Sequence, residues 1–319
     1  MFRFQIIEVK PPVKIWLLIT GLFWLLFTPA FTRADAFISE DRVYYGADSY
    51  TIDYEKEIIH AKGNAYFTKD DKKVKADRIE IYYAGKKKKA LFFRNVVVQD
   101  QKRKSEVRGD FGEALYRENL YRIEGNAVYT DPERTVQARL IEKRGEEETV
   151  FSGNVFYRDT EYEIGASQLK ITARSASFIS DVEVLQLASG DRVHCSILDY
   201  SMPSRDITFQ GEVVYLQKDG GESNNPLIMR SKGIRYFHDQ DMFLLLGDVL
   251  IMTSDVSMNT DVARYRRRVK KLEATGDVVV RKKNRYVYCN NLEYDFETGK
   301  LIYSHSVRGI VPIKEESQE

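Results

Sequence analysis

The sequence predicts an almost wholly β protein built from stacked strand-turn-strand repeats. Apolar and polar residues alternate with a period of two between about residues 43 and 311, which is the pattern of strands that bury one face. The chain also contains 20 Tyr and 17 Phe, residues that favour strands. A nine-residue unit recurs about every 30 residues, a spacing typical of stacked or solenoid architectures.

The unit is clearest at residues 207–215, which read Ile-Thr-Phe-Gln-Gly-Glu-Val-Val-Tyr. Apolar residues lie two and four places before and after the central glycine, and the residue after the glycine is Asn, Asp or Glu in the glycine-centred copies. Such copies are centred on Gly63, Gly125, Gly153, Gly211, Gly247 and Gly276, and degenerate copies on Arg94, Ser180 and His305. The glycine either leaves room inside the fold or marks a bulge or a close contact between sheets.

A second strand is expected after each unit and a short polar turn. A small residue follows four of the glycines 13 places later, at Ala76, Ala138, Ala166 and Cys289. After Gly63 it opens the alternating run Ala-Asp-Arg-Ile-Glu-Ile-Tyr at residues 76–82. We therefore predict that the second strand of each repeat begins at this small residue.

The N-terminus has the features of a secretion signal. Arg3, Lys10 and Lys14 precede an apolar run at residues 15–31, and Ala34-Asp35-Ala36 supplies small residues for cleavage. This pattern predicts a signal peptide over residues 1–36. The alternative is an uncleaved membrane anchor, although the run is short for a spanning helix.

The rest of the chain divides at one polar loop. Residues 217–226 read Gln-Lys-Asp-Gly-Gly-Glu-Ser-Asn-Asn-Pro, a composition typical of loops. We expect a first block at residues 37–216, a second block at residues 227–312 that continues the stack, and a disordered tail at residues 313–319.

Charge and cysteine content narrow the possible functions. The first 36 residues carry four basic and two acidic residues, so the remaining chain has 45 basic and 46 acidic residues. A balance near zero gives no general attraction to nucleic acid. Cys195 and Cys289 both occupy the small-residue position. They are expected to be buried packing residues, with a disulfide as the alternative in an oxidising compartment.

No motif in the sequence indicates catalysis. The four His are scattered, without the spacing of metal ligands, and there is no glycine-rich phosphate loop or nucleophile elbow. Asp77 and Asp110 recur at one repeat position, which suggests a turn or strand-end role. We predict no enzyme activity, no metal and no cofactor. Basic clusters such as residues 266–271 fit either solvated turns or contacts with phosphate groups.

The pairing of Gly-Asn-Ala at residues 63–65 with the run at residues 76–82, repeated behind a secretion signal, resembles the OstA-like family. This family includes the periplasmic LptA and LptC proteins and the N-terminal domain of LptD, which act in lipopolysaccharide export. The resemblance covers about residues 40–311. It implies an elongated open β-jellyroll of two facing sheets, with an apolar groove that receives the acyl chains of lipopolysaccharide.

Strand parity then identifies candidate groove residues, because alternate side chains point to the same face. They are Ile59, Ala65, Phe67, Ile123, Ala127, Tyr129, Phe151, Val155, Tyr157, Phe209, Val213, Tyr215, Phe243, Leu245, Val249, Ile251, Val278 and Val280.

The resemblance implies a periplasmic bridge that passes lipopolysaccharide or a related glycolipid toward the outer membrane. Its expected partners are other lipopolysaccharide-transport components at both membranes and further copies of the chain joined end to end. Two alternatives remain open. One is a structural β-solenoid that polymerises and binds no lipid, and the other is an LptC-like receiver anchored in the inner membrane.

Overall fold

The computed structural model describes residues 44–310, except residues 70, 85–87, 116–117, 146–147 and 219–225. The expected signal at residues 1–36, the tail at residues 313–319 and most of the polar loop therefore lie outside the described residues. All the regular structure of the described part is β-strand, which confirms the all-β prediction. None of its segments forms a helix long and apolar enough to cross a membrane.

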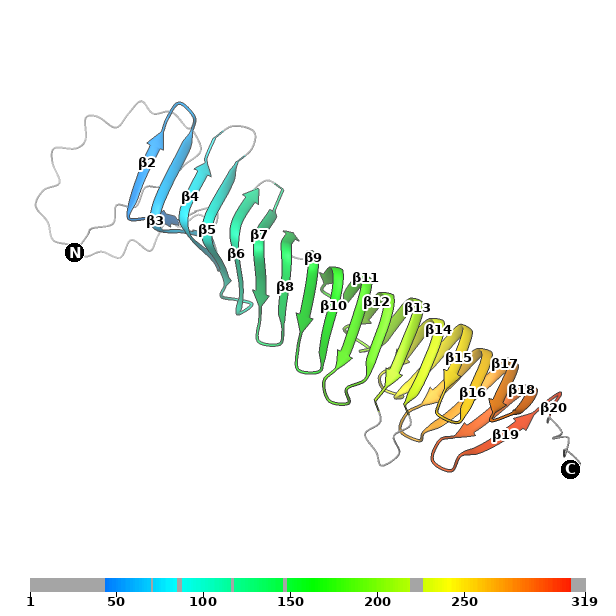
Figure 1. The fold of residues 1–319 in the computed structure, drawn as a ribbon. Helices are drawn as coiled ribbons and strands as arrows, with labels where there is room; N and C mark the ends of the chain where they lie inside the picture. Colours follow the sequence, from blue (N-terminus) through cyan, green and yellow to red (C-terminus); the bar gives the residue numbers. More distant parts are fainter. Residues whose placement is uncertain are drawn as a thin grey trace, which may run out of the picture. The chain divides into compact units, whose positions relative to one another are not determined.

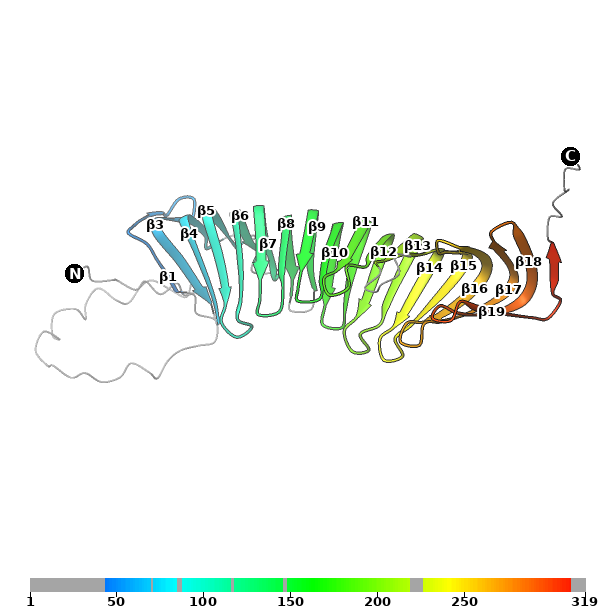
Figure 2. The same ribbon diagram turned by 60° about the horizontal axis from the view of Figure 1, so that its bottom comes forward.

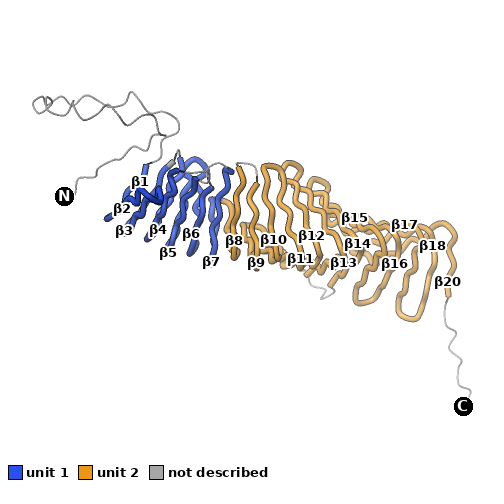
Figure 3. Tube along the Cα trace, turned by 90° about the horizontal axis from the view of Figure 1, so that it is seen from above, with its two compact units in different colours: residues 1–132 blue, residues 133–319 orange. Residues whose placement is uncertain are grey.

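The chain forms two compact units, residues 1–132 and residues 133–319 (Figure 3). Unit 1 contains β1 (Tyr44–Gly46), β2 (Ser49–Asp53), β3 (Ile58–Lys69), β4 (Lys72–Tyr82), β5 (Lys89–Asp100), β6 (Ser105–Leu115) and β7 (Leu120–Thr130). Unit 2 contains β8 (Thr135–Arg144), β9 (Glu148–Arg158), β10 (Tyr162–Thr172), β11 (Ser175–Gln186), β12 (Arg192–Ser201), β13 (Ile207–Gln217), β14 (Leu227–Phe237), β15 (Met242–Met252), β16 (Val256–Arg266), β17 (Lys271–Lys282), β18 (Arg285–Asp295), β19 (Lys300–Ser304) and β20 (Arg308–Ile310).

The boundary between the units differs from the expected division at residues 217–226. β13 and β14 flank that loop and pair along their lengths, from Ile207 opposite Tyr236 to Gln217 opposite Leu227. The hydrogen-bonded ladder therefore continues past the loop, and the loop lies within unit 2.

Within each unit, successive long strands pair antiparallel and lie side by side (Figure 1). In unit 1, β1 and β2 both pair with β3, one on each side of Gly63. In unit 2, β19 and β20 both pair with β18. His305 and Ser306 lie between β19 and β20 with φ angles of 63° and 54°. The degenerate copy centred on His305 thus occupies a repeat position.

The central glycines lie at β-bulges in the strands. β13 pairs with β14 through Gln210 opposite Gly233 and then Val213 opposite Ser231, so β13 carries one extra residue. The bulged residues Gly211 and Glu212 have φ angles of 75° and 41°. Gly and Asn tolerate this left-handed region better than most residues do, which explains why Gly-Asn recurs at the centre of the nine-residue repeat.

Each unit folds its ladder across the line of bulges. Tyr215 aligns through Met229 with Ile251 of β15, and a flat strand would place Ile251 about 26 Å from Phe243. The rings of Tyr215 and Phe243 nevertheless lie 5.0 Å apart. In unit 1, Phe67 of β3 lies 6.1 Å from Phe92 of β5 in the same way. The two facing sheets implied by the resemblance are therefore two arms of one folded sheet in each unit.

We call the part of the ladder before the bulges the first arm, represented in β13 by residues 207–210, and the part after them the second arm, represented by residues 213–217. The strands of unit 2 curve visibly from one arm into the other between β14 and β18 (Figure 2). Because hairpin turns alternate between the two ends of antiparallel strands, every turn lies at the edge of one arm or the other.

The second strand of each repeat begins earlier than expected. β4 begins at Lys72, so Ala76 lies inside the strand and is buried. The turns are correspondingly short. In the β9–β10 turn, Oδ1 of Asp159 accepts the backbone N–H groups of Glu161 and Tyr162, both at 2.7 Å. Such side-chain caps provide acceptors for the backbone N–H groups of the turn, so no further turn residues are needed.

Candidate functional site

The candidate groove residues point into the folded sheet. All are buried except Tyr129 and Tyr157, which are half-buried. Unit 1 contains Ile59, Ala65, Phe67, Ile123, Ala127 and Tyr129, and unit 2 contains Phe151, Val155, Tyr157, Phe209, Val213, Tyr215, Phe243, Leu245, Val249, Ile251, Val278 and Val280. Each unit therefore has its own apolar interior.

Side chains at the alternate strand positions point to the outer face of the sheet. In β13, Phe209 and Val213 are buried, whereas Gln210 and Glu212 are exposed. The faces of β15 are harder to assign from the sequence, because its outward-facing residues are also apolar. Even there Leu245 is buried and Leu246 is 43% exposed. The repeat frame therefore assigns the inner and outer faces correctly even where hydrophobicity alone does not.

In unit 2 the interior is closed by its own side chains. Phe209, Val213, Phe243 and Leu245 are between 0% and 4% exposed. Rings from the two arms touch, because Tyr215 lies 5.0 Å from Phe243. Tyr157 contacts Phe178 in the same way, at 5.4 Å. A ligand in this interior must therefore separate the arms or replace contacts between them.

Tyrosines form a polar rim to each interior. The hydroxyl of Tyr129 donates to Oδ2 of Asp131 at 2.9 Å in unit 1. In unit 2, Tyr157 donates to Oδ2 of Asp159 at 2.7 Å, and Tyr215 to Oδ2 of Asp191 at 2.7 Å. Each ring covers apolar side chains while its hydroxyl reaches a turn at the arm edge, as is typical of tyrosine at an apolar boundary.

The central glycines do not widen the interior. Gly211 is exposed, and a Cβ built there would lie 2.6 Å from the Ser196 Oγ, which belongs to the exposed Ser196. A Cβ at Gly125 would likewise lie 2.5 Å from Oδ2 of Asp110. These glycines provide the left-handed backbone of the bulge and allow the neighbouring strand to approach.

Asp77 and Asp110 lie at the bulge line, and the expectation of a turn or strand-end position is wrong. Oδ1 and Oδ2 of Asp77 accept hydrogen bonds from Nδ2 of Asn95 at 3.2 and 3.1 Å. Oδ2 of Asp110 accepts a hydrogen bond from Nδ2 of Asn126 at 3.3 Å. Each Asn follows the first bulged residue of its strand. Aspartate recurs at this position because it bonds to the bulge of the neighbouring strand.

The titratable side chains of the described residues form neither a metal site nor a reactive thiol. No three His, Cys, Asp or Glu side chains there are grouped to hold a metal ion. Cys195 and Cys289 are free and buried, which confirms the expectation that they are packing residues. Burial raises the pKa of the Cys195 thiol to about 12, so it is not an activated nucleophile.

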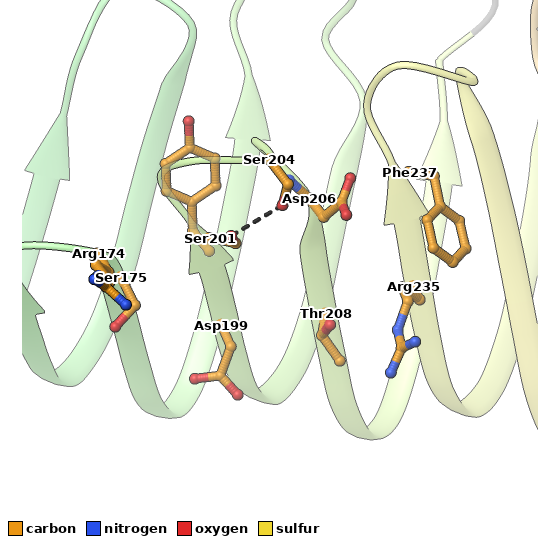
Figure 4. Close-up of a pocket in the computed structure, with 10 residues that line it drawn as sticks. Arg174, Ser175, Asp199, Ser201, Ser204, Asp206, Thr208, Arg235 and Phe237 are labelled. Carbon is orange, nitrogen blue, oxygen red and sulfur yellow. Dashed lines mark hydrogen bonds between the residues drawn. The ribbon is translucent and has the colours of Figure 1, made fainter.

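Sequence reasoning missed a small pocket on the outer face of unit 2, because its residues share no motif. Asp199, Thr208 and Arg235 lie on three adjacent strands, and Ser204 donates to the Ser201 Oγ at 2.9 Å (Figure 4). The pocket has a volume of about 340 Å³. Its carboxylate and guanidinium groups do not suit an acyl chain.

Sequence reasoning also missed a charged cluster at the arm edges of unit 2. Nε of Arg267 lies 3.0 Å from Oδ1 of Asp241, and its Nη1 lies 3.8 Å from Oδ2 of Asp191. Asp191 is 3% exposed and Asp241 is 7% exposed. The basic segment at residues 266–271 is therefore not simply a solvated turn. The residues of the cluster come from three separate turns, so no local spacing could have identified it.

Comparison with known proteins gives a family match over part of unit 1 and the start of unit 2. Residues 46–149 match the family described as LptA/(LptD N-terminal domain) LPS transport protein. This match confirms the resemblance to the OstA-like family over those residues. No curated protein matches the chain.

Among solved structures, the chain is similar to LptH of Pseudomonas aeruginosa, the LptA-homologous periplasmic component of the lipopolysaccharide transport device. The identity is 10%, and the alignment covers 56% of this chain and 86% of LptH, with a TM-score of 0.19. At that score the likeness adds nothing to the argument for the fold, which rests on the strands described above.

Proposed function

We propose that the chain is a periplasmic carrier that helps to pass lipopolysaccharide, or a related glycolipid, from the inner to the outer membrane. Acyl chains would lie between the two arms while sugars and phosphates stay in water, and no covalent bond would change. The observation that carries this proposal is the single-parity apolar interior, found in a chain whose residues 46–149 match a lipopolysaccharide-transport family.

Energetics favour binding by the acyl chains. Burial of apolar surface contributes about 25 cal/mol per Å², so a lipid with several chains gains far more inside the arms than on the outer face. A charged headgroup would lose its hydration there. The interior therefore suits one end of an amphiphile, with the other end outside the arm edges.

Partners follow from the same proposal. The strands β19 and β20 occupy one terminal position of the ladder in unit 2, where Ile302 is 45% exposed and Ile310 is 56% exposed. Unpaired strand edges recruit further strands. We propose that copies join end to end through such edges and that transport components at the two membranes complete the bridge.

Site-specific photo-cross-linking in the cell envelope tests the lipid interior. A photoreactive side chain at Phe209 or Val213 should capture lipopolysaccharide, and one at Gln210 or Glu212 in the same strand should not. Mass spectrometry of the captured adduct identifies the lipid. Equal capture from both faces would mean adhesion to the surface and would reject the groove.

A structural β-solenoid that binds no lipid is the second candidate, because the interior side chains are closely packed. It predicts polymers and no capture from any of the four positions. N-terminal sequencing of envelope-extracted protein separates the remaining alternative, an anchored inner-membrane receiver, from a cleaved carrier.

A further inference from the structure

The two arm edges of unit 2 meet through residues of different turns. Asp191 lies in the β11–β12 turn, at the edge of the second arm, and Arg267 lies in the β16–β17 turn, at the edge of the first arm. These edges are at opposite ends of the strands. The 3.8 Å approach of Arg267 Nη1 to Asp191 Oδ2 therefore crosses the seam along which the folded sheet could open.

One further contact holds Asp191 within its own arm edge, and another joins the two edges. The backbone N–H of Lys218 donates to Oδ1 of Asp191 at 3.0 Å, which fixes this carboxylate to the end of β13. The hydroxyl of Tyr265 in the first arm donates to Oε1 of Gln217 in the second arm at 3.3 Å. We call Asp191, Tyr215, Asp241 and Arg267 the seam cluster.

A second ion pair crosses the seam elsewhere. Nη2 of Arg205, in the β12–β13 turn, lies 3.1 Å from Oε1 of Glu161 in the β9–β10 turn. Both side chains are about half exposed, at 48% and 52%, so water and salt screen the pair and it adds little. The seam cluster is different because its two carboxylates are buried.

We propose that the seam of unit 2 opens and closes and that the seam cluster is its latch. This rests on the proposed function, because the interior side chains are shielded when the seam is closed and an acyl chain needs a way between the arms. A buried ion pair suits a latch: desolvation offsets much of the attraction, so the closed state is specific without being strongly favoured. Opening parts the Arg267–Asp191 contact, the Tyr265–Gln217 hydrogen bond and the exposed Arg205–Glu161 pair, and it breaks no backbone pairing within an arm.

The chain contains its own reporter of opening. Cys195 lies in β12, the strand that follows Asp191, and the residue is 1% exposed, inside the folded sheet. With Cys289→Ala as the background, Cys195 is the only thiol. Its reaction with a soluble disulfide reagent then measures how often the seam opens, without any lipid present.

Arg267→Met should raise the rate of Cys195 labelling at least tenfold. Arg266→Met is the matched control. Arg266 has the same charge and is adjacent in the chain, but it forms an exposed pair with Glu273 at 2.8 Å, so its rate should equal that of the parent. An unchanged rate in Arg267→Met, or an equal rise in both variants, would overturn the latch.

Urea separates opening of the seam from unfolding. Labelling through the seam should depend weakly on low urea concentrations, whereas labelling through global unfolding should rise steeply with the surface exposed. If Arg267→Met proves unstable, the triple variant Asp191→Asn, Asp241→Asn, Arg267→Met removes the latch without leaving buried charge. Slow, steeply urea-dependent labelling of that variant would also overturn the proposal.

A cross-linked form connects the latch to lipid entry. Glu161→Cys and Arg205→Cys, in a background where Cys195 and Cys289 are Ala, can be joined across the seam by a short bismaleimide. The joined protein should lose lipid capture at Phe209, and the unjoined protein should retain it. Retained capture in the joined form would reject entry through the seam. Faster Cys195 labelling in Arg267→Met without capture in any form would leave the latch intact and reject the lipid function.

Discussion

Tyr215 donates its hydroxyl hydrogen to Oδ2 of Asp191 at 2.7 Å, and both side chains are 3% exposed. Asp191 also accepts the backbone N–H of Lys218 and faces Arg267 across the seam. A carboxylate so far from water depends on these donors, because a buried charge without partners is strongly disfavoured. The tyrosine is therefore both an apolar interior residue and part of the polar arrangement that holds the edges together.

Tyr215→Phe should lower the free energy of unfolding by about 2 kcal/mol, since it removes one donor from a buried charged group and keeps the ring. Urea titration followed by circular dichroism measures the change. The control is Tyr288→Phe, at a tyrosine that is 40% exposed, which should shift the free energy by less than about 0.5 kcal/mol. Equal effects would show that the Tyr215 hydroxyl is not needed.

Alkaline pH should destabilise unit 2. Burial raises the pKa of Tyr162 and of Tyr265 to about 12, and burial together with the Asp191 charge raises the pKa of Tyr215. The folded state therefore keeps these protons at a pH where the unfolded chain has lost them. The resulting stability is fully present below about pH 10 and is lost as pH rises through the folded pKa.

Urea unfolding at about pH 9 and pH 11 measures this loss, and the midpoint should be lower at the higher pH. Tyr265→Phe should lose less between the two pH values, because its side chain cannot ionise. Absorbance near 295 nm should show a class of tyrosines that ionises well above pH 10. Ionisation of every tyrosine near pH 10 would contradict the prediction.

Gly211→Ala should destabilise the protein by about 2 kcal/mol, because an L-residue in the left-handed region is strained and its Cβ would lie 2.6 Å from the Ser196 Oγ. Adding Ser196→Gly should recover the part of the lost stability that comes from the contact between the new Cβ and the Ser196 Oγ. Gly165→Ala is the control: its φ is not in that region, nothing lies within 4 Å of its built Cβ, and it should be neutral or stabilising by about 0.5 kcal/mol. Similar losses at both sites would reject the bulge explanation.

The degenerate repeats predict changes of opposite sign. Ser180 and Arg94 occupy the central position with φ angles of 63° and 60°, so Ser180→Gly and Arg94→Gly should each stabilise by up to about 1 kcal/mol. Thermal unfolding measures this gain. Ser152→Gly, at a strand position without positive φ, should instead be destabilising by about 0.5–1 kcal/mol.

Strand parity was predictable from the sequence because it depends on local alternation. That local rule predicts Phe209 and Val213 as interior residues, and both are buried. The repeat pattern alone does not decide the role of glycine, because either interpretation requires a small residue, and only the backbone angles of Gly211 distinguish them. The contact of Arg267 with Asp191 was beyond local reasoning. The contact depends on how far the sheet folds across its bulges. The sequence around Arg267 and around Asp191 contains no motif that indicates the pairing.

The terminal strands should control self-association. Ile302→Lys together with Ile310→Lys places charge on the two exposed large apolar residues of β19 and β20, which disfavours pairing of that edge with another copy. Sedimentation velocity over a concentration series should show at least a tenfold weaker association than in the parent. Leu246→Lys is the control, since Leu246 is 43% exposed but lies in β15, which is paired on both sides. A parent that stays monomeric at every concentration, or a Leu246→Lys variant that weakens association equally, would exclude assembly through this edge.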